Sequence, residues 1–555
     1  MPPALAAYHA AHGPGENSSL KTSSGRPLGS AGRRRARGKG WAGLALPVPL
    51  PLPGPPGGGV GNGRNLRGDT PFSALPRSQL RGWSWEVPAA WVPFPATVPA
   101  LWTRDSEASA LHAMALTTFL AGLLLLLLPN YALLLILPTR GHTPGGPVVP
   151  NHPFTTIWNA DTHTCLEKFH VDVDLDVFDV VANPGEAFMG REMTIFYSNK
   201  LGLYPSYTSS GQPLHGGLPQ NASLATHLAQ AQLDIQAAIP KSNYWGLAVI
   251  DWESWRPLWA LNWDSKDVYR ERSRALVREE HPDWSSWQVE EEAVIQFQTA
   301  ARAWMSQTLQ LGQTLRPRGL WGFYGFPACY NYDFKNPNYT GACPDGIQPL
   351  NQELQWLWNQ SRALYPSIYL PSELEGTGYT WPFVRERVRE AFRMAMGTGD
   401  ASLPVLPYAQ IYYDKTNHFL PLEELENSIG ESVAQGVAGV VLWVSWEDTH
   451  TKESCENIKD YVDSTLGPFI LNLTSSTQLC SQALCSGHGR CARRRDHPHA
   501  FLYLNSSSFS IHRPPGSRHL VLTGKLPKED QARMMIEFEC HCYKGWRGEQ
   551  CERKE

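Results

Sequence analysis

The feature that most restricts the fold of this chain is an alternation of two kinds of segment between Asn151 and Leu471. Short runs rich in β-branched and aromatic residues predict strands over 154–158, 194–197, 247–250, 319–324, 367–370, 405–413 and 437–443. Longer stretches with apolar residues near the helical period predict helices over 222–238, 268–279, 287–315, 350–364, 383–396 and 422–435. This alternation is typical of an α/β fold with a parallel sheet, and its length favours a (β/α) TIM-like barrel, which we place at residues 150–476.

Several other classes of protein are excluded by motifs and composition. No G-x-G-x-x-G or phosphate-binding loop follows a predicted strand, so we expect no nucleotide cofactor. The chain has 48 Lys and Arg against 52 Asp and Glu, a net charge of −4, which argues against a strongly basic nucleic-acid-binding protein. With 42% hydrophobic and 18% charged residues, the chain as a whole is not disordered.

Residues 1–113 differ in composition from the rest of the chain. They contain a basic run at 33–37, a proline-rich tract at 47–56 and three glycines at 57–59, with no sustained apolar period. Such a segment cannot bury enough apolar surface to offset its ordering entropy, so we predict a disordered upstream extension. The basic run is also compatible with a nuclear or nucleic-acid patch, an alternative that the next segment disfavours.

Residues 115–137 are almost entirely apolar and follow directly after Met114. Counted to Leu128 the run has the length of the apolar region inside a secretory signal peptide, whereas counted whole it could span a bilayer as a signal anchor. We interpret residues 114–141 as a signal peptide, with the signal anchor as the alternative, and Met114 as the usual start. After cleavage we expect no stable membrane anchor, because no second apolar tail follows Cys551.

Cysteines and glycosylation acceptors also point to export. All ten cysteines lie after the apolar run, which is typical of an oxidising compartment. Five N-x-S/T sequons follow residue 141, at Asn221, Asn338, Asn359, Asn472 and Asn505. We therefore expect a glycoprotein of the secretory pathway that is lysosomal, secreted or both.

The last six cysteines form a cluster over residues 477–555. Their spacings are C-x4-C-x5-C, a long insertion, and then C-x-C-x8-C. Both ends resemble an EGF-like module. Sequence alone allows 15 pairings of six cysteines, and the resemblance implies Cys480–Cys491, Cys485–Cys540 and Cys542–Cys551. The insertion over 492–539 departs from that pattern, and a zinc site at 540–542 is a weaker alternative because exported thiols usually pair.

Polar or amphipathic residues follow the predicted strands where the active groups of a barrel lie. Asp251 and Glu253 end one strand, while Tyr324 and Trp443 end two others. Side chains at i and i+2 of a strand share a face and lie about 6.6 Å apart. Two carboxylates at that distance repel when both are ionised, so one keeps its proton to higher pH, as a general acid requires. A solvated pair, or a partner for Arg256, is the plainer alternative.

Eight motifs of the chain closely resemble the hyaluronidases of glycoside hydrolase family 56. They are PFTTIWNA (153–160), VFDVVANPG (177–185), MTIFY (193–197), GGLPQNASL (216–224), GLAVIDWESWRP (246–257), GFYGFPACYNYDF (322–334), SIYLPS (367–372) and VVLWVSWED (440–448). The resemblance covers about residues 150–555 and is strongest to the acid-active members. It implies a distorted (β/α) barrel that hydrolyses β-1,4 bonds of hyaluronan, and chondroitin more weakly, with retention at acidic pH.

The resemblance also implies roles for individual residues. Glu253 matches the general acid/base, and Asp251 matches the neighbour that holds the substrate's acetamido group, whose own oxygen acts as nucleophile. Tyr324, Tyr369 and Trp443 match the pocket for that group. Arg256 and Arg387 match positions near the groove, where a guanidinium can bind a carboxylate, although for Arg387 a surface helix charge is the default interpretation. Further groove candidates are Asn159, Tyr197, Tyr332, Tyr408 and Asp414.

The remaining cysteines match two bridges of the family, Cys165–Cys455 and Cys329–Cys343. One departure is Ala328, which stands where the family commonly has an acidic residue. We expect a monomer that binds hyaluronan and related glycosaminoglycans and needs no metal. The alternatives are a non-catalytic hyaluronan-binding relative and, more weakly, an adhesion or signalling protein that acts through its EGF-like module.

Overall fold

The computed structural model of this chain describes residues 145–181, 192–399 and 403–555. The predicted extension (1–113) and signal segment (114–141) lie outside these residues. Within the described ranges, no helix combines the length and apolarity that crossing a membrane requires.

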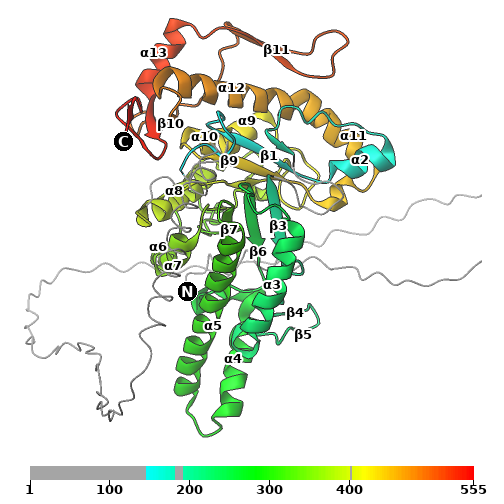
Figure 1. Cartoon of the computed structure of the whole chain (residues 1–555), viewed down its shortest axis with the longest axis vertical. Coiled ribbons are helices and arrows are strands. Elements are labelled where there is room, and N and C mark those ends of the chain that lie inside the picture. Colours follow the sequence, from blue (N-terminus) through cyan, green and yellow to red (C-terminus); the bar gives the residue numbers. More distant parts are fainter. Residues whose placement is uncertain (1–144, 182–191, 400–402) are drawn as a thin grey trace, which may run out of the picture. The chain divides into compact units, whose positions relative to one another are not determined.

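Parallel strands occupy the centre of the described chain (Figure 1). One sheet has the order β2-β1-β9-β8 and the other β3-β6-β7. Their bounds are β1 (Thr155–Asn159), β2 (Val180–Val181), β3 (Met193–Tyr197), β6 (Leu247–Asp251), β7 (Leu320–Phe323), β8 (Tyr408–Ala409) and β9 (Gly439–Trp443). Isolated parallel bridges from residues 364–367 reach Tyr324 on one side and Val405 and Tyr408 on the other. In the described ranges no ladder joins β2 to β3, so the parallel strands form two sheets.

Two of the predicted strands are the main departures from the sequence interpretation. Residues 367–370 form no strand, and the predicted strand at 405–413 is reduced to β8. Pro366 and Pro371 flank the first segment, Pro404 precedes the second and Pro407 interrupts it. Proline has no N–H to give to a ladder. These segments therefore pair through single backbone hydrogen bonds, such as Leu406 N to Leu364 O at 2.9 Å.

Helices follow most of the strands. Their bounds are α2 (Thr162–Phe169), α3 (Leu224–Ala238), α4 (Asp267–Glu280), α5 (Ser286–Leu315), α6 (Ile347–Glu353), α7 (Gln355–Gln360), α8 (Thr380–Gly397), α9 (Leu422–Leu425), α10 (Glu431–Ala434), α11 (Lys452–Tyr461), α12 (Gly467–Leu484) and α13 (Lys528–Glu537). The longest, α5, begins at a capping box in which Ser285 and Gln288 satisfy each other's backbone N–H groups. The predicted helix at 350–364 is two short helices, α6 and α7. Helices α2, α11, α12 and α13 were not predicted.

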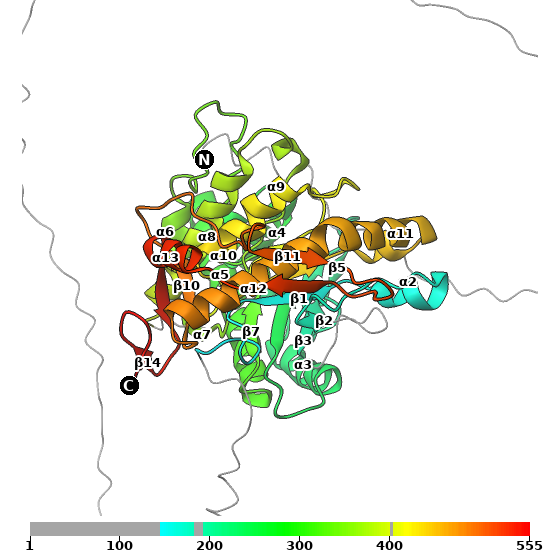
Figure 2. The same ribbon diagram turned by 90° about the horizontal axis from the view of Figure 1, so that it is seen from above.

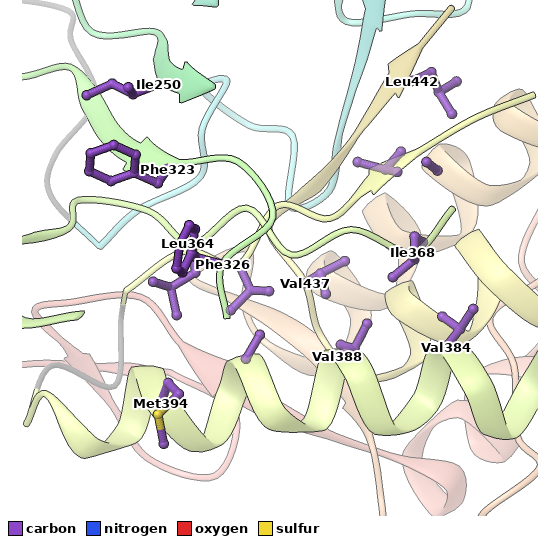
Figure 3. Close-up of a cluster of buried hydrophobic side chains, with 14 of the residues drawn as sticks. Ile250, Phe323, Phe326, Leu364, Ile368, Val384, Val388, Met394, Val437 and Leu442 are labelled. Atoms are coloured by element: carbon purple, nitrogen blue, oxygen red, sulfur yellow. The ribbon is translucent and has the colours of Figure 1, made fainter. Parts of the chain in front are cut away.

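A continuous apolar core joins the helices to the strands (Figure 3). Val384, Val388 and Met394 lie along one face of α8, and none of them is exposed. They belong to the same buried cluster as Ile250 at the end of β6 and Leu442 in β9. Apolar residues at i, i+4 and i+10 bring one helix face to the core. Helix α8 is therefore fixed against strands that end at the same edge.

Five disulfides cross-link the described chain. They are Cys165–Cys455, Cys329–Cys343, Cys480–Cys491, Cys485–Cys540 and Cys542–Cys551. These are the same five pairs that the two resemblances imply. Because Cys540 and Cys542 are both bridged, a zinc site at 540–542 is excluded. The first bridge joins residues 290 apart in sequence, and a loop of that length gives about 5–6 kcal/mol of stabilisation in the chain-entropy account.

The C-terminal region is built from short antiparallel pairs beside α12. The pairs are β10 (Gly489–Arg493) with β13 (Phe538–Cys542), β11 (Phe509–His512) with β12 (Val521–Gly524), and β14 (Trp546–Arg547) with β15 (Arg553–Lys554). A further short pair, β4 (Ser206–Tyr207) with β5 (Pro213–Leu214), lies earlier in the chain. Helix α12 contacts β1, β10 and β13 and runs beside β11 in both views (Figures 1 and 2). It also runs through the boundary predicted at residue 476.

The 492–539 insertion contacts the main body through charged groups. Arg518 forms an ion pair with Asp172, and Arg513 lies 2.9 Å from Asp463. His519 Nδ1 lies 2.6 Å from Asp176 Oδ2 and 3.3 Å from Asp174 Oδ1. Four acidic side chains thus face three basic ones across this contact. Charge complementarity thus holds the insertion to the segment after α2 and to Asp463, just after α11.

A buried ion pair joins β10 to α10. Arg493 Nη2 lies 2.7 Å from Glu431 Oε1, and their side chains are 6% and 0% exposed. Trp381 Nε1 donates to the other oxygen of Glu431 at 2.8 Å. Burial raises the pKa of Glu431 against the opposing effect of Arg493. The two donors offset part of the cost of burying this carboxylate.

We predict that Arg493→Met destabilises the protein by about 3–5 kcal/mol, because it leaves the Glu431 carboxylate buried without its cation. Thermal or urea unfolding followed by circular dichroism measures the loss. Arg494→Met is the matched control, since Arg494 lies 3.7 Å from Glu539 in a half-exposed pair and its removal should cost less than about 1 kcal/mol. Equal losses in the two variants would contradict the prediction.

Candidate active site

The parallel register brings the predicted site residues to one edge of the strands. Tyr197 at the end of β3 is the register partner of Asp251 at the end of β6. Tyr324 directly follows β7, and its N–H donates to the Ile250 carbonyl at 2.9 Å. Trp443 ends β9. Because parallel strands end together, residues distant in sequence meet here.

Asp251 and Glu253 line the same two cavities, which have volumes of about 760 Å³ and 120 Å³. Trp252 between them points the other way and stacks on Tyr204, with ring centroids 4.7 Å apart. The i, i+2 pattern of a strand is thus kept past the end of β6. The two carboxyls face one space.

The two carboxyls differ in their environment. The side chain of Glu253 is 56% exposed, whereas Asp251 Oδ1 is buried with no hydrogen-bond partner in the described chain. Burial and then the charge of Glu253 hold the pKa of Asp251 well above its ordinary value, against the opposing effect of Arg256. One proton therefore stays on the pair to higher pH than on an isolated carboxyl.

Four aromatic side chains, the aromatic group, line the smaller cavity. Tyr324, Tyr369, Tyr408 and Trp443 all line it. Tyr369 and Trp443 are stacked at 6.2 Å between ring centroids, and Tyr324 meets Tyr408 edge-on at 4.9 Å. Burial, followed by the charges of Glu253 and Asp251, raises the pKa of Tyr324 well above its ordinary value. Its phenol stays protonated and can donate a hydrogen bond.

Trp443 is oriented by Tyr197. The indole Nε1–H of Trp443 donates to the Tyr197 hydroxyl at 3.1 Å. Burial, and then the charge of Asp251, also raises the pKa of Tyr197. With the indole N–H already bonded, the side chain offers its flat apolar face to the cavity.

Arg256 and Arg387 line the larger cavity and are both buried, at 9% and 6% exposure. Arg387 donates to Asn331 Oδ1 and to the Ser367 carbonyl, each at 2.8 Å, so the default interpretation of a surface helix charge is wrong. Arg256 Nη2 lies 3.9 Å from Glu253 Oε1. One nitrogen of each guanidinium, Nη1 of Arg256 and Nη2 of Arg387, is buried without a hydrogen-bond partner in the described chain. Both sites have donor capacity left for an anion.

The remaining candidates divide into two groups. Tyr197, Tyr332 and Asp414 line the larger cavity, and burial raises the pKa of Asp414. Asn159 does not reach either cavity wall. It is fully buried at the end of β1, where it is the register partner of Trp443.

Sequence interpretation missed several residues of the larger cavity. They include Tyr207, Tyr269, Lys266, Tyr330 and Lys415. They come from loops, helix ends or, for Tyr207, the two-residue strand β4, where no periodic pattern marks a side chain that faces a cavity. Asn331, which holds Arg387, was not predicted although it lies inside the family motif at 322–334. Ala328, the departure from the resemblance, also lines this wall.

Comparison with known proteins places this arrangement in a family. The family model described as hyaluronidase matches residues 143–555. The chain belongs to the hyaluronidase family. It is 65% identical over 428 residues to Hyaluronidase-1 of Homo sapiens, covering 77% of this chain and 98% of that protein. It is 43% identical over 412 residues to Hyaluronidase-2 of Mus musculus, covering 73% of this chain and 87% of the relative.

A solved member of the hyaluronidase family has a similar fold. Bee venom hyaluronidase in complex with a hyaluronic acid tetramer matches with a TM-score of 0.53 and 31% identity, over 57% of this chain and 98% of that one. The α/β arrangement of parallel strands and surrounding helices is therefore a family fold. The family model leaves out residues 1–142.

The raised pKa of Asp251 makes stability depend on pH in a defined direction. Above the ordinary carboxyl pKa of about 3.9, the folded chain retains a proton that the unfolded chain has lost, so the free energy of unfolding falls as pH rises. The Asp251→Asn variant cannot ionise at this position, so its free energy of unfolding does not fall with pH for this reason. We expect the melting temperature of the variant minus that of wild type to increase between about pH 3 and pH 7.

Circular dichroism melts across this pH range measure the difference. Asp283→Asn, at an exposed position, is the control and should show the same melting difference at every pH. A melting difference for Asp251→Asn that does not change with pH would contradict the assignment.

Proposed function

We propose that the chain is an endo-β-N-acetylhexosaminidase that hydrolyses the β-1,4 bonds of hyaluronan, and of chondroitin more weakly, with retention at acidic pH. The observation that carries the proposal is that Asp251 and Glu253 line one cavity together with Tyr324, Tyr369 and Trp443. Family membership and the likeness to a hyaluronidase in complex with a hyaluronic acid tetramer support the same substrate.

Glu253 acts as general acid and then as general base. Its exposed carboxyl gives a proton to the leaving glycosidic oxygen as the bond from that oxygen to C1 breaks. The substrate's acetamido oxygen forms a bond to C1 from the opposite face, giving an oxazoline-like intermediate. Water then attacks C1 and gives its proton to Glu253 while the bond from C1 to the acetamido oxygen breaks. This step restores the acetamido group and leaves C1 with net retention.

Asp251 and the aromatic group position the acetamido nucleophile. Asp251 is buried beside the reacting centre and holds the acetamido group while it shares the proton of the pair. Tyr324 and Tyr369 keep protonated phenols that donate to the acetamido oxygen. The face of Trp443 covers the methyl group. This arrangement needs no second carboxylate as nucleophile.

Cations and groove residues bind the rest of the polyanionic chain. Arg256 and Arg387, each with a spare buried N–H group, bind glucuronate carboxylates. Tyr197, Tyr332, Tyr408 and Asp414 shape the groove, and Asn159 supports it from behind Trp443.

The proposal extends to the architecture and the fate of the chain. The two parallel sheets, bridged through residues 364–367, form one distorted (β/α) TIM-like barrel over 150–476. Residues 477–555 form an EGF-like module with a long insertion, which the three disulfides of this region support. The chain is a monomeric glycoprotein of the secretory pathway, lysosomal or secreted, with glycans at Asn221, Asn338, Asn359, Asn472 and Asn505.

We predict that Glu253→Gln lowers kcat on hyaluronan by at least about 10³-fold, because the amide cannot donate the proton. Reducing-end release and product sizing measure the loss, and an unchanged melting profile shows that folding is intact. Glu279→Gln, which removes an exposed carboxylate on α4, should retain full activity. Full activity in Glu253→Gln would refute the assignment, whereas wild type that binds hyaluronan without cleaving it would favour the non-catalytic alternative.

We predict that depolymerisation is fastest near about pH 4 and falls steeply above about pH 6, because the departing oxygen needs a proton from Glu253. Initial rates of hyaluronan cleavage across this range measure the profile. Binding of hyaluronan fragments over the same range separates lost chemistry from lost affinity. A maximum near neutral pH would contradict the acid-active proposal.

A further inference from the structure

Four cationic side chains line the larger cavity, namely Arg256, Lys266, Arg387 and Lys415. Their roles can be separated by what already binds them. A cation that is paired within the protein has less free energy to gain from an anionic ligand than one that is not. The two arginines already have a role in the proposed function. Of the side chains without a role, we single out Lys266, whose ammonium group has the fewest opposite charges or hydrogen-bond acceptors of the described chain bound to it.

The two arginines are partly engaged by the protein. Arg387 is fixed by two hydrogen bonds at 2.8 Å and lies over the rings of Tyr332 and Phe383, at 4.7 Å and 4.1 Å from the centroids. Arg256 lies 3.9 Å from Glu253 and 4.8 Å from the centroid of the Phe326 ring. These contacts hold both guanidinium groups in place.

The backbone of Lys266 is fixed by a hydrogen bond, whereas its ammonium group is not fixed by any opposite charge of the described chain. It ends the short 3₁₀ turn Asp264–Lys266, and its N–H donates to the Trp263 carbonyl at 3.1 Å. Its side chain is only partly exposed. Among residues 145–181, 192–399 and 403–555, its ammonium group forms no ion pair and no side-chain hydrogen bond.

The position of Lys266 is also electrostatically unfavourable. The residue precedes α4 as its N-cap without any side-chain cap bond, and the positive end of a helix dipole disfavours a cation there. Burial, and then the charge of Arg256, lowers the pKa of Lys266 to about 8, against the opposing effect of Glu253. The group remains cationic at acidic and neutral pH but lacks compensation within the protein.

We propose that Lys266 is a specificity-determining residue that binds a uronate carboxylate of the substrate at the subsite beside Glu253. The inference rests on the proposed function and deepens it, since it assigns to one side chain the preference for an anionic over a neutral polysaccharide. An ammonium on a flexible stem suits this task, because it can follow a carboxylate whose position varies along the groove. The ammonium group of Lys266 is in an unfavourable environment in the free protein, and a bound carboxylate makes that environment favourable.

The test compares Lys266→Gln with wild type on two substrates. On hyaluronan we expect KM to rise about five- to tenfold with kcat within about twofold, because a charge-assisted contact of this size is lost from binding. On hyaluronan whose carboxyl groups have been reduced to alcohols, the two proteins should have the same KM. Lys266→Arg should restore the hyaluronan KM to within about twofold of wild type.

Two controls separate recognition from structure. Lys241→Gln removes an exposed lysine that lines neither cavity and should leave both KM values unchanged. The melting temperature of Lys266→Gln should equal or exceed that of wild type, because the variant relieves a cation at a helix N-terminus. A structural role would instead lower the melting temperature and impair both substrates equally.

Three outcomes would overturn the inference. An unchanged hyaluronan KM in Lys266→Gln would remove Lys266 from recognition, and so would equal losses on the anionic and the neutral substrate. In both cases wild type still cleaves hyaluronan, so the proposed function survives. Wild type that fails to cleave hyaluronan would overturn the proposed function and this inference together.

Discussion

The parallel register of the strands is the constraint on which the site depends. It pairs Tyr197 with Asp251 in one sheet and Asn159 with Trp443 in the other, and the hydrogen bond from Trp443 to Tyr197 joins the two pairs. Packing of α8 and the other helices against the apolar faces of those strands keeps the edge rigid. A shift of one residue in β6 would turn Asp251 and Glu253 into the core and bring Trp252 to the cavity. The backbone hydrogen bonds between the strands therefore decide which side chains face the cavity.

The cavity wall holds polar atoms that the described protein does not satisfy. Asp251 Oδ1, Arg256 Nη1 and Arg387 Nη2 are buried without a partner among the described residues. Such atoms cost about 1–3 kcal/mol each unless something else bonds to them. A ligand with its own polar groups would bond to these atoms and recover that cost.

Sequence reasoning succeeded where a regular period marks the structure. The apolar period predicted α3, α4, α5 and α8 nearly to their ends, and the polar residues after apolar runs pointed to Asp251 and Glu253. It failed at 405–413, where Pro404 and Pro407 limit the strand. Strand propensity counts apolar and β-branched residues but does not register that a proline lacks the N–H that a ladder needs. Sequence reasoning also placed Asn159 in the groove, although Asn159 lines neither cavity. For Arg387 the local pattern left a surface charge as the default beside the groove position, since burial depends on neighbours such as Asn331 that no local pattern reveals. Lys266 lies in a loop and gave no signal at all.

The Cys165–Cys455 bridge has a consequence for how the chain would be processed. It joins α2 to α11 across 290 positions, a span that contains the acid pair and most of the cavity wall. A protease that nicks an exposed loop within this span would cut the polypeptide without releasing either piece. The nicked protein would migrate as one species on a denaturing gel until a thiol is added, and its two fragments would stay together in the meantime.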